Sequence, residues 1–450
     1  MSSEQERQRA LELIRLHGWN STSFQTLEQG YRYYFHAGGC IAYVDTRRAW
    51  VVAGAPIAPF PEIPEILREF LATARSAGRR VCLFAVEQRL LELAAGQLRS
   101  LRIGEQPVWD PQKWSEILRR RRSLREQLRR SRAKGVTVRE VTAAELDAGD
   151  TREGIARVAE RWLRTRSMAP MDFLVRVELF SFTADRRCFV AEQAGRIVGV
   201  AGVVPVPARP GWFIEDLVRD PTAPNGTAEL LIDGVMRWAN GQSCRWLTLG
   251  LAPLAGDVSP LLRAARRSGA LLYDFRGLRS YKAKLEPQQW LPIYLSYPPT
   301  QSAWLSVTDA LWAFTRTGFL GFGWRTLTRG PIVVIRVLAL LLLPWTALLA
   351  LAPTEIWFGS PWLKWGWVSF DLLVAAGLFR FLHKRQTATL TALAVAVTLD
   401  AVLTPLEAVL WNLPRARRPL DYVIIVVACL APLTASIVLW GARRARVDAA

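Results

Sequence analysis

The chain has few of the residues that build disulfide frameworks and metal centres. Its 450 residues include five cysteines and three histidines. The odd number of cysteines and the lack of a Cys-x-x-Cys pair argue against a disulfide framework or a zinc site, and they fit a reducing compartment. His17, His36 and His383 lie outside every motif described below. We therefore expect no histidine-based catalysis, no metal and no cofactor.

Acidic residues are scarce relative to basic ones. The chain contains 58 Lys and Arg against 39 Asp and Glu, which gives a formal net charge of +19 at pH 7. Such an excess suits a partner that carries phosphates, either an anionic lipid or tRNA. Basic cytoplasmic loops of a membrane protein, together with an arginine-rich composition, are the alternative explanation.

An apolar signal-peptide core is also missing from the polar, charged residues 1–7, so we expect the N-terminal part to stay in the cytoplasm. Four apolar segments near the other end, at 331–352, 365–382, 387–411 and 420–441, are long enough to span a bilayer. Basic residues beside these spans predict a multi-pass protein of the plasma (inner) membrane with a cytoplasmic catalytic domain. Arg415, Arg417 and Arg418 contradict that orientation and leave the topology of the third span open.

Three carboxylates, Asp371, Asp400 and Glu407, fall within or near the spans. Intramembrane carboxylates are costly, and they indicate either a function or an ion pair with a neighbouring arginine. The sequence leaves both explanations open.

The soluble part shows one order of elements twice. The first half is predicted to contain strands at 31–35, 40–45 and 49–54, a helix at 62–77, a strand at 80–87, a helix at 88–96 and a strand at 100–104. The second half is predicted to contain strands at 188–193, 196–204 and 211–218, a helix at 227–240, a strand at 245–250, a helix at 258–267 and a strand at 270–275. Three antiparallel strands, a helix and then strand–helix–strand is the order of the acetyltransferase-like (GNAT) fold. We predict an α/β (α+β) chain with this fold in tandem, followed by an all-α membrane domain of about four transmembrane helices.

The predicted domains follow from this order. They are a first acetyltransferase-like unit at 1–112, a basic linker helix at 113–135, a second, catalytic unit at 136–298, an amphipathic interfacial segment at 299–330 and a transmembrane domain at 331–450. The linker has eight arginines between Arg119 and Arg132, with leucines recurring at helical spacing, so we expect an amphipathic helix that either binds phosphates or is simply a solvated face.

Four clusters follow one another in a fixed order in the second unit. They are EDLVR at 215–219, PNGT at 224–227, LGLAPL at 249–254 and YDFRGLRSYKAK at 273–284, closed by Trp290. Their order resembles the C-terminal catalytic domain of the phosphatidylglycerol lysyltransferases, the multiple peptide resistance factor family. Ser123-Leu124-Arg125 in the linker also looks like a motif of that family.

The resemblance covers about residues 31–298 and implies the same tandem fold. It also implies that the chain moves an aminoacyl group, of lysine or another amino acid, from aminoacyl-tRNA to phosphatidylglycerol or a related anionic lipid. Such a reaction supports resistance to antimicrobial peptides in the family. In the best-known members the membrane domain precedes the catalytic domain, whereas here four spans follow it. The amino acid, the acceptor lipid and the oligomeric state are not indicated by the sequence.

Glu215 and Asp216 are expected to alternate across the third strand of the second unit, so that only one of them faces the central cleft. Asp216 aligns with the acidic residue of the family motif, which implies recognition of the amine or general-base catalysis; a structural pair with Arg219 is the alternative. We expect Asp216, Arg219 and Asn225 to be catalytic. Asn225 is expected either to bind the acyl carbonyl or to cap the following helix.

The remaining predicted contacts are to substrate. Arg279 and Lys282 lie three residues apart on a predicted helical turn and are expected to face the same phosphate. The full set of expected substrate-binding residues is Glu215, Thr227, Arg276, Arg279, Tyr281, Lys282, Lys284 and Arg125. A solvated basic surface is the alternative for the cationic members, and ordinary packing is the alternative for Tyr281.

Two other functions remain open. An N-acyltransferase that uses acyl-CoA would have a glycine-rich pyrophosphate loop, but the loop at 224–227 has one glycine and no Gln/Arg-x-x-Gly-x-Gly/Ala run. A catalytically silent, membrane-anchored module that binds lipid or nucleic acid is the third possibility. Segment 302–329 mixes aromatic residues with Arg316, Arg325 and Arg329, and we expect it either to lie in the membrane interface or to pack on the catalytic unit.

Overall fold

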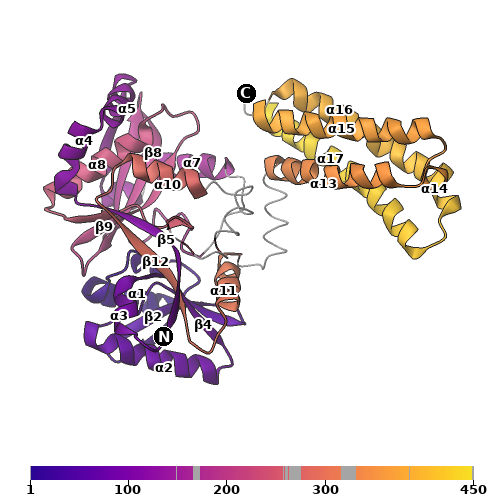
Figure 1. The fold of residues 1–450 in the computed structure, drawn as a ribbon. Coiled ribbons are helices and arrows are strands. Elements are labelled where there is room, and N and C mark those ends of the chain that lie inside the picture. Colours follow the sequence, from indigo (N-terminus) through magenta and orange to yellow (C-terminus); the bar gives the residue numbers. More distant parts are fainter. Residues whose placement is uncertain are drawn as a thin grey trace. The chain divides into compact units, whose positions relative to one another are not determined.

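A computed structural model describes residues 2–147, 149–165, 173–256, 258, 262, 275–315, 331–384 and 386–447. The described residues fall into two compact units, one ending at residue 315 and one starting at residue 331. Figure 1 shows the mixed sheet and helices of the first unit and the helices of the second.

The first half of the soluble unit begins with a capped helix, in which the hydroxyl of Ser2 accepts from the backbone N–H of Gln5. Its elements are α1 (Ser3–His17), β1 (Arg32–His36), β2 (Gly39–Asp45), β3 (Ala49–Ala53), α2 (Ile63–Ser76), β4 (Arg80–Glu87), α3 (Gln88–Leu93) and β5 (Arg99–Trp109). Short 3₁₀ turns lie at Phe24–Leu27, Phe60–Glu62 and Pro111–Lys113. The first three strands are antiparallel, and β4 runs parallel to β3.

The second half repeats this order. Its elements are α4 (Trp114–Arg120), α5 (Arg122–Ala133), β6 (Val136–Val141), α6 (Ala143–Asp147), α7 (Asp150–Arg164), β7 (Arg187–Gln193), β8 (Arg196–Val206), β9 (Gly211–Arg219), α8 (Thr227–Gly241), β10 (Trp246–Thr248), β11 (Ala252–Pro253), α10 (Phe275–Lys284), β12 (Gln289–Tyr297) and α11 (Ala303–Thr315). Strands β6 to β9 are antiparallel, and β10 runs parallel to β9. The predicted acetyltransferase-like order is thus confirmed for the first half, and for the second half as far as β10. The helix expected at 258–267 and the strand expected at 270–275 lie outside the described residues, apart from Val258, Leu262 and Phe275, and Phe275 begins α10.

Within the described residues, one twelve-stranded sheet joins the two halves in the order β1-β2-β3-β4-β12-β5-β10-β9-β8-β7-β6, with β11 beside β5. The halves exchange strands, because β12 from the second half lies between β4 and β5 of the first. In return, β5 pairs with β10 and β11 of the second half. The expected boundaries at residues 112 and 298 fall just after β5 and β12, and both of these strands form hydrogen bonds with strands of the other half.

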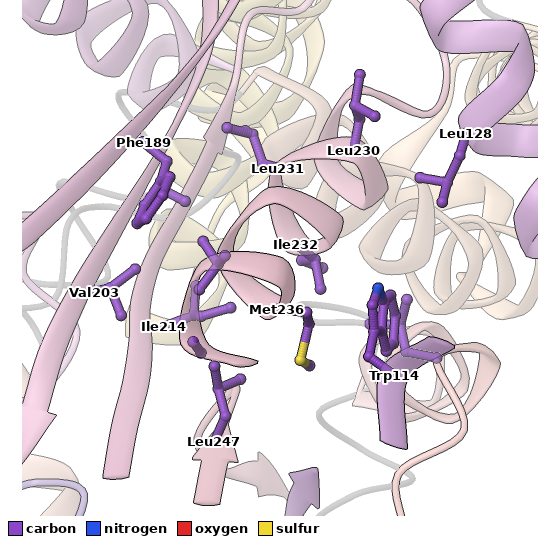
Figure 2. Packing of buried hydrophobic residues seen from close by; sticks show 14 of the residues in the cluster. Trp114, Leu128, Phe189, Val203, Ile214, Leu230, Leu231, Ile232, Met236 and Leu247 are labelled. Carbon is purple, nitrogen blue, oxygen red and sulfur yellow. The ribbon is translucent and has the colours of Figure 1, made fainter. Parts of the chain in front are cut away.

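Helix α8 lies between the sheet and the pair of helices α4 and α5. Figure 2 shows Phe189 and Val203 of the sheet on one side of α8, and Trp114 and Leu128 on the other. All four side chains are almost completely buried in a single apolar cluster. This packing fixes α4 and α5 to the second half of the soluble unit.

The linker differs from the single helix that the sequence predicts. Arg121 adopts φ −95° and ψ 84°, which ends α4 before α5 begins. The guanidinium of Arg125 donates to the carbonyls of Leu118 (2.7 Å) and Arg119, so it satisfies the last carbonyls of α4. Ending the helix at Arg121 costs little free energy, because the guanidinium of Arg125 donates to the backbone carbonyls left free at the end of α4.

Helix α11 belongs to the soluble unit and contacts β3, β4 and β12. Asp309 forms two hydrogen bonds with Arg80, at 2.6 and 2.7 Å, on its packed side. Trp304, Leu305 and Leu311 stay exposed. The part of segment 302–329 that is described thus packs on the sheet and also presents apolar side chains; residues 316–330, with Arg316, Arg325 and Arg329, lie outside the described residues.

The second unit consists of α13 (Pro331–Leu351), α14 (Thr354–Trp357), α15 (Pro361–Lys384), α16 (Thr387–Glu407), a π-helical turn at Ala408–Asn412, a 3₁₀ turn at Leu413–Arg415 and α17 (Pro419–Val447). Among the described residues, four helices are long and apolar enough to cross a membrane. This agrees with the predicted membrane domain.

The three carboxylates predicted within or near the spans lie beside neutral side chains. Asp371 lies 3.5 Å from the hydroxyl of Thr346, Asp400 accepts from Thr404 at 2.6 Å, and Glu407 accepts from the indole of Trp367 at 2.7 Å. Among the described residues, no arginine forms an ion pair with Asp371, Asp400 or Glu407. The ion pair considered from the sequence is therefore not what holds them.

Candidate functional site

A β-bulge in β9 decides where its two acidic side chains lie. Gly202 of β8 pairs with Asp216, whereas the next residue, Val203, pairs with Ile214, so Glu215 is the extra residue. A bulge interrupts the alternation of side chains along a strand and often re-aims them next to a functional site. The expectation that only one of Glu215 and Asp216 faces the site is therefore wrong, because both reach the same arginine.

That arginine is Arg186, the residue before β7. Its Nη1 lies 2.5 Å from Oε2 of Glu215 and 3.9 Å from Oδ2 of Asp216. The side chains of Arg186 and Glu215 are each 2% exposed, and that of Asp216 is 8% exposed. The guanidinium also donates to the carbonyl of Ser181 at 3.3 Å, which fixes its direction. Arg186, and not Arg219, is the cationic partner of Asp216.

Glu28, which follows the 3₁₀ turn Phe24–Leu27, is a third buried acid near Glu215 and Asp216. It is 4% exposed, and neither of its carboxylate oxygens has a hydrogen-bond partner among the described residues. Burial, followed by the negative charges of Glu215 and Asp216, raises the pKa of Glu28 to about 9. Glu28 therefore keeps its proton at neutral pH.

Carboxyl groups outnumber guanidinium groups in this cluster. Glu28, Glu215 and Asp216 face the single guanidinium of Arg186, while nearby Glu178 pairs with Arg176 at 2.9 Å. Burial, with the charge of Glu215 as the next cause, raises the pKa of Asp216 well above its usual value. Oδ2 of Asp216 and Oε1 of Glu215 are buried, and no described residue forms a hydrogen bond with either atom. We define Glu28, Arg186, Glu215 and Asp216 as the acid cluster; its composition suits a ligand that brings a positive charge.

The loop before α8 holds the next predicted residues. Nη1 of Arg219 lies 3.5 Å from Oδ1 of Asn225, so these two are brought together at the end of β9. Gly226 is the N-cap of α8 with φ +97°, and no side chain caps the helix, so Asn225 does not cap it. Thr227 is completely buried, and its hydroxyl donates to the carbonyl of Pro224 at 2.7 Å.

Arg279 and Lys282 of α10 are not brought to a shared phosphate position. The Nζ of Lys282 is buried and donates to the carbonyls of Leu249, Gly250 and Leu251 at 2.7, 2.9 and 3.0 Å. The guanidinium of Arg279 stacks 4.8 Å from the centre of the Trp290 ring and lies 3.5 Å from Oε2 of Glu105. Lys282 thus ties α10 to the segment after β10, and Arg279 packs beside β12.

The other predicted residues take separate places. Tyr281 packs against the apolar cluster of α8 with its hydroxyl buried, and Lys284 is exposed. Arg125 caps α4, as described above. The side chain of Arg276 lies outside the described residues. Within the part of the chain that the structure describes, no group of three or more His, Cys, Asp or Glu residues could hold a metal ion.

The family model described as "Phosphatidylglycerol lysyltransferase, C-terminal" matches residues 11–297, which include the acid cluster, β9, α8 and α10. The chain belongs to this family. It is 26% identical over 296 residues to the phosphatidylglycerol lysyltransferase of Bacillus subtilis, covering 62% of this chain and 33% of that protein. It is 30% identical over 138 residues to the lysylphosphatidylglycerol biosynthesis bifunctional protein LysX of Nocardia farcinica, covering 30% of this chain and 12% of that protein.

Two solved structures share the fold of the soluble part. The C-terminal domain of a putative lysylphosphatidylglycerol synthetase from Agrobacterium fabrum has a TM-score of 0.60 at 22% identity and covers 69% of this chain and 96% of that one. L-PGS from Bacillus licheniformis has a TM-score of 0.59 at 21% identity, with 68% and 96% covered. The chain thus covers 96% of both solved chains but only 33% of the Bacillus subtilis protein.

Sequence reasoning missed Glu28 and Arg186. Neither stands in one of the four clusters, and Glu28 lies far along the chain from β9. The available signal was indirect: two adjacent acids in a buried strand call for a cationic partner, and Arg186 directly precedes a strand of the same sheet.

Proposed function

We propose that this chain transfers an aminoacyl group from aminoacyl-tRNA to the hydroxyl of phosphatidylglycerol or a related anionic lipid. The observation that supports this best is the acid cluster, in which Glu215 and Asp216 of the bulged strand β9 and the buried Glu28 lie near the guanidinium of Arg186. An aminoacyl ester carries a free ammonium group, and a lysyl ester carries two. Membership of the family supports a lipid product. That the donor is aminoacyl-tRNA is a separate part of the proposal.

The reaction is an ester exchange. The lipid hydroxyl oxygen attacks the aminoacyl carbonyl, a new ester C–O bond forms, and the bond between the carbonyl carbon and the ribose oxygen breaks. The proton of the lipid hydroxyl passes to the ribose oxygen that leaves. The protein therefore has to hold the ammonium group, accept or relay one proton and stabilise the oxyanion.

Asp216 is the candidate for the first or the second of these roles. Its raised pKa means that it can hold a proton in the free protein and release it when an ammonium group binds nearby. A carboxylate with a raised pKa is also a better proton acceptor than an ordinary one. Glu28 and Glu215 would share the charge of the ammonium group, while Arg186 keeps the carboxylates in place.

The start of α8 argues against acyl-CoA as the donor. In acetyltransferases the pyrophosphate of acetyl-CoA lies at this helix start, where backbone N–H groups are free. Here α5 covers it: a Cβ on Gly226 would lie 2.8 Å from the carbonyl oxygen of Gln127 and 3.2 Å from the side chain of Ser131. A carbonyl oxygen at that position repels an anion.

We propose that the catalytic unit lies on the cytoplasmic side of the plasma membrane. Charged tRNA is present there, and the basic residues beside three of the four spans favour that side. The acceptor lipid is then reached at the inner surface of the bilayer.

The proposal is tested with membranes from cells that produce the full chain. These are incubated with radiolabelled lysyl-tRNA or other aminoacyl-tRNAs, and lipids are separated by charge and stained with ninhydrin. We expect a labelled, ninhydrin-positive phospholipid whose formation stops after RNase treatment. Activity that resists RNase but needs acyl-CoA would favour the N-acyltransferase, and no lipid product with any aminoacyl-tRNA would contradict the proposal.

Asp216→Asn tests the site itself. Because asparagine has the shape of the protonated acid, we expect normal amounts of folded protein and a loss of transfer of about 100-fold or more. Glu160→Gln is the matched control, since Glu160 is an exposed acid paired only with Arg164. A folded Asp216→Asn protein with normal turnover would exclude Asp216 from both roles.

A further inference from the structure

A groove between α4, α5 and α8 carries an arginine rim over an apolar wall, and none of its residues belongs to the acid cluster. Its volume is about 540 Å³, which falls within the range of small-molecule sites. The rim includes Arg119, Arg125, Arg129, Arg132 and Arg237. The wall includes Trp114, Leu118, Leu128 and Met236.

A buried carboxylate holds two of these arginines in place. Oδ2 of Asp233 accepts from Arg132 at 2.5 Å and from Arg237 at 3.0 Å. Oδ1 of the same residue accepts from the indole of Trp114 at 2.8 Å, and the Asp233 side chain is only 2% exposed. The side chains of Arg132 and Arg237 are 49% and 62% exposed, so their remaining N–H groups face solvent.

The charges of the groove do not balance. Five guanidinium groups line it, while the acids that meet them are Asp233 and Glu126, which pairs with Arg129 at 3.0 Å. Two guanidiniums fixed on one carboxylate form a rigid donor pair that matches a phosphate group. Because Arg125 is also fixed, on the last carbonyls of α4, much of the rim is ordered before any ligand binds.

We propose that this groove is a second lipid site, which binds the phosphate of an anionic glycerophospholipid with its rim and the upper part of an acyl chain against its wall. The apolar wall favours a lipid over RNA, because RNA phosphates would need only the exposed rim. Leu118 is partly buried and lines the groove, so it offers contact to a chain without opening the core. The site would hold the soluble unit on an anionic bilayer whether or not the transfer reaction occurs.

The test uses the full chain in a neutral detergent with a phosphatidylglycerol that carries a photoreactive group in one acyl chain. After irradiation, labelled peptides are mapped by mass spectrometry. We expect label on the peptides that carry α4, α5 and the second half of α8. The double variant Arg119→Gln, Arg129→Gln should lower this labelling by roughly tenfold, and Arg157→Gln, Arg164→Gln on α7 should leave it unchanged, since those arginines are paired on an exposed helix.

Two further variants distinguish lipid binding from RNA binding, and the groove from the proposed transfer site. Leu118→Trp fills the groove and keeps every arginine, so lipid labelling should fall while binding of an oligoribonucleotide should not. Asp216→Asn should keep the groove label even if it stops transfer, which separates this site from the proposed reaction. The proposal is overturned if label appears only elsewhere, if Leu118→Trp has no effect, or if inorganic phosphate or the oligoribonucleotide removes the label completely.

Discussion

At the scale of single residues, the most unusual group is Glu28. A buried carboxyl group without a hydrogen-bond partner is costly unless it is protonated or meets a cation. Glu28 is 4% exposed and, in the described part of the chain, both of its oxygens lack a hydrogen-bond partner. A ligand ammonium group would satisfy it, so its unfavourable position in the free protein becomes favourable during binding.

Glu28 should make stability depend on pH. Its pKa rises from 4.5 to about 9 on folding, so the folded protein holds a proton that the unfolded chain releases. The stability linked to Glu28 is complete below the lower value and is lost as pH rises towards the upper one, by at most about 1.4 kcal/mol per pH unit. In detergent, the unfolding temperature should fall from pH 6 to pH 8, and Glu28→Gln should weaken that fall.

Glu160→Gln serves as the control for this experiment, because Glu160 is exposed on α7. If Glu28→Gln melts with the same pH dependence as the unchanged protein, Glu28 is ionised in the folded state and is not part of an acid-rich site.

The residue scale is also where the sequence is least informative. Asp216 was found from the family motif, but its partner Arg186 depends on a bulge and on a loop that precedes β7. A single extra residue in a strand leaves no mark in the pattern of apolar positions. Glu215, predicted to face away from Asp216, therefore came to lie beside the same guanidinium.

At the scale of elements, Lys282 shows how a charge can serve structure. Burial lowers its pKa to about 7, and its Nζ still has three carbonyl acceptors. Three acceptors match the three N–H donors of the ammonium form. Lys282 thus fixes α10 against Leu249–Leu251, a segment without a regular hydrogen-bond ladder of its own.

Lys282→Met should destabilise the soluble unit by about 2–5 kcal/mol, because three buried carbonyls lose their donor. Lys284→Met, two residues further along the same helix and exposed, should leave the unfolding temperature unchanged. The measurement is thermal or denaturant unfolding of both variants in the same detergent. Equal stability of the two variants would show that the carbonyls are satisfied by other donors.

Most elements could be predicted from sequence because their apolar periodicity is strong. Strand β4 was predicted with its final bounds, and α8 differs by one residue at its end. Strand β12 was missed, although it lies near the centre of the sheet. Its sequence, QWLPIYLSY, contains a proline and follows a helix closely, so it does not look like a central strand. The break at Arg121 was missed because it depends on a contact from Arg125.

At the scale of the whole molecule, the exchanged strands make the two halves one folding unit. Strand β12 hydrogen-bonds to β4 on one side and to β5 on the other. Neither half keeps its sheet without a strand from the other. The repeat of elements was predictable from sequence, whereas the exchange was not, because it depends on pairings between strands far apart in the chain.

A chain of residues 136–298 should therefore fail to fold, because β12 loses both of its partners and β10 loses β5. A chain of residues 1–315 contains every strand of the sheet and should unfold in one cooperative transition. Soluble yield, near-ultraviolet circular dichroism and a denaturant titration compare the two. A soluble, cooperatively unfolding 136–298 chain would show that the exchange is dispensable.

The position of β12 also has a consequence for synthesis. Strand β4 leaves the ribosome roughly 200 residues before β12, an interval of about 10–40 s at 5–20 residues per second. During that time the edge of β4 has no partner and is open to pairing with another chain. Strand β12 ends at Tyr297 and the first membrane helix starts at Pro331. The last strand that closes the sheet and the first segment that enters the bilayer therefore emerge almost together, so the nascent chain reaches the membrane with its soluble part only just complete.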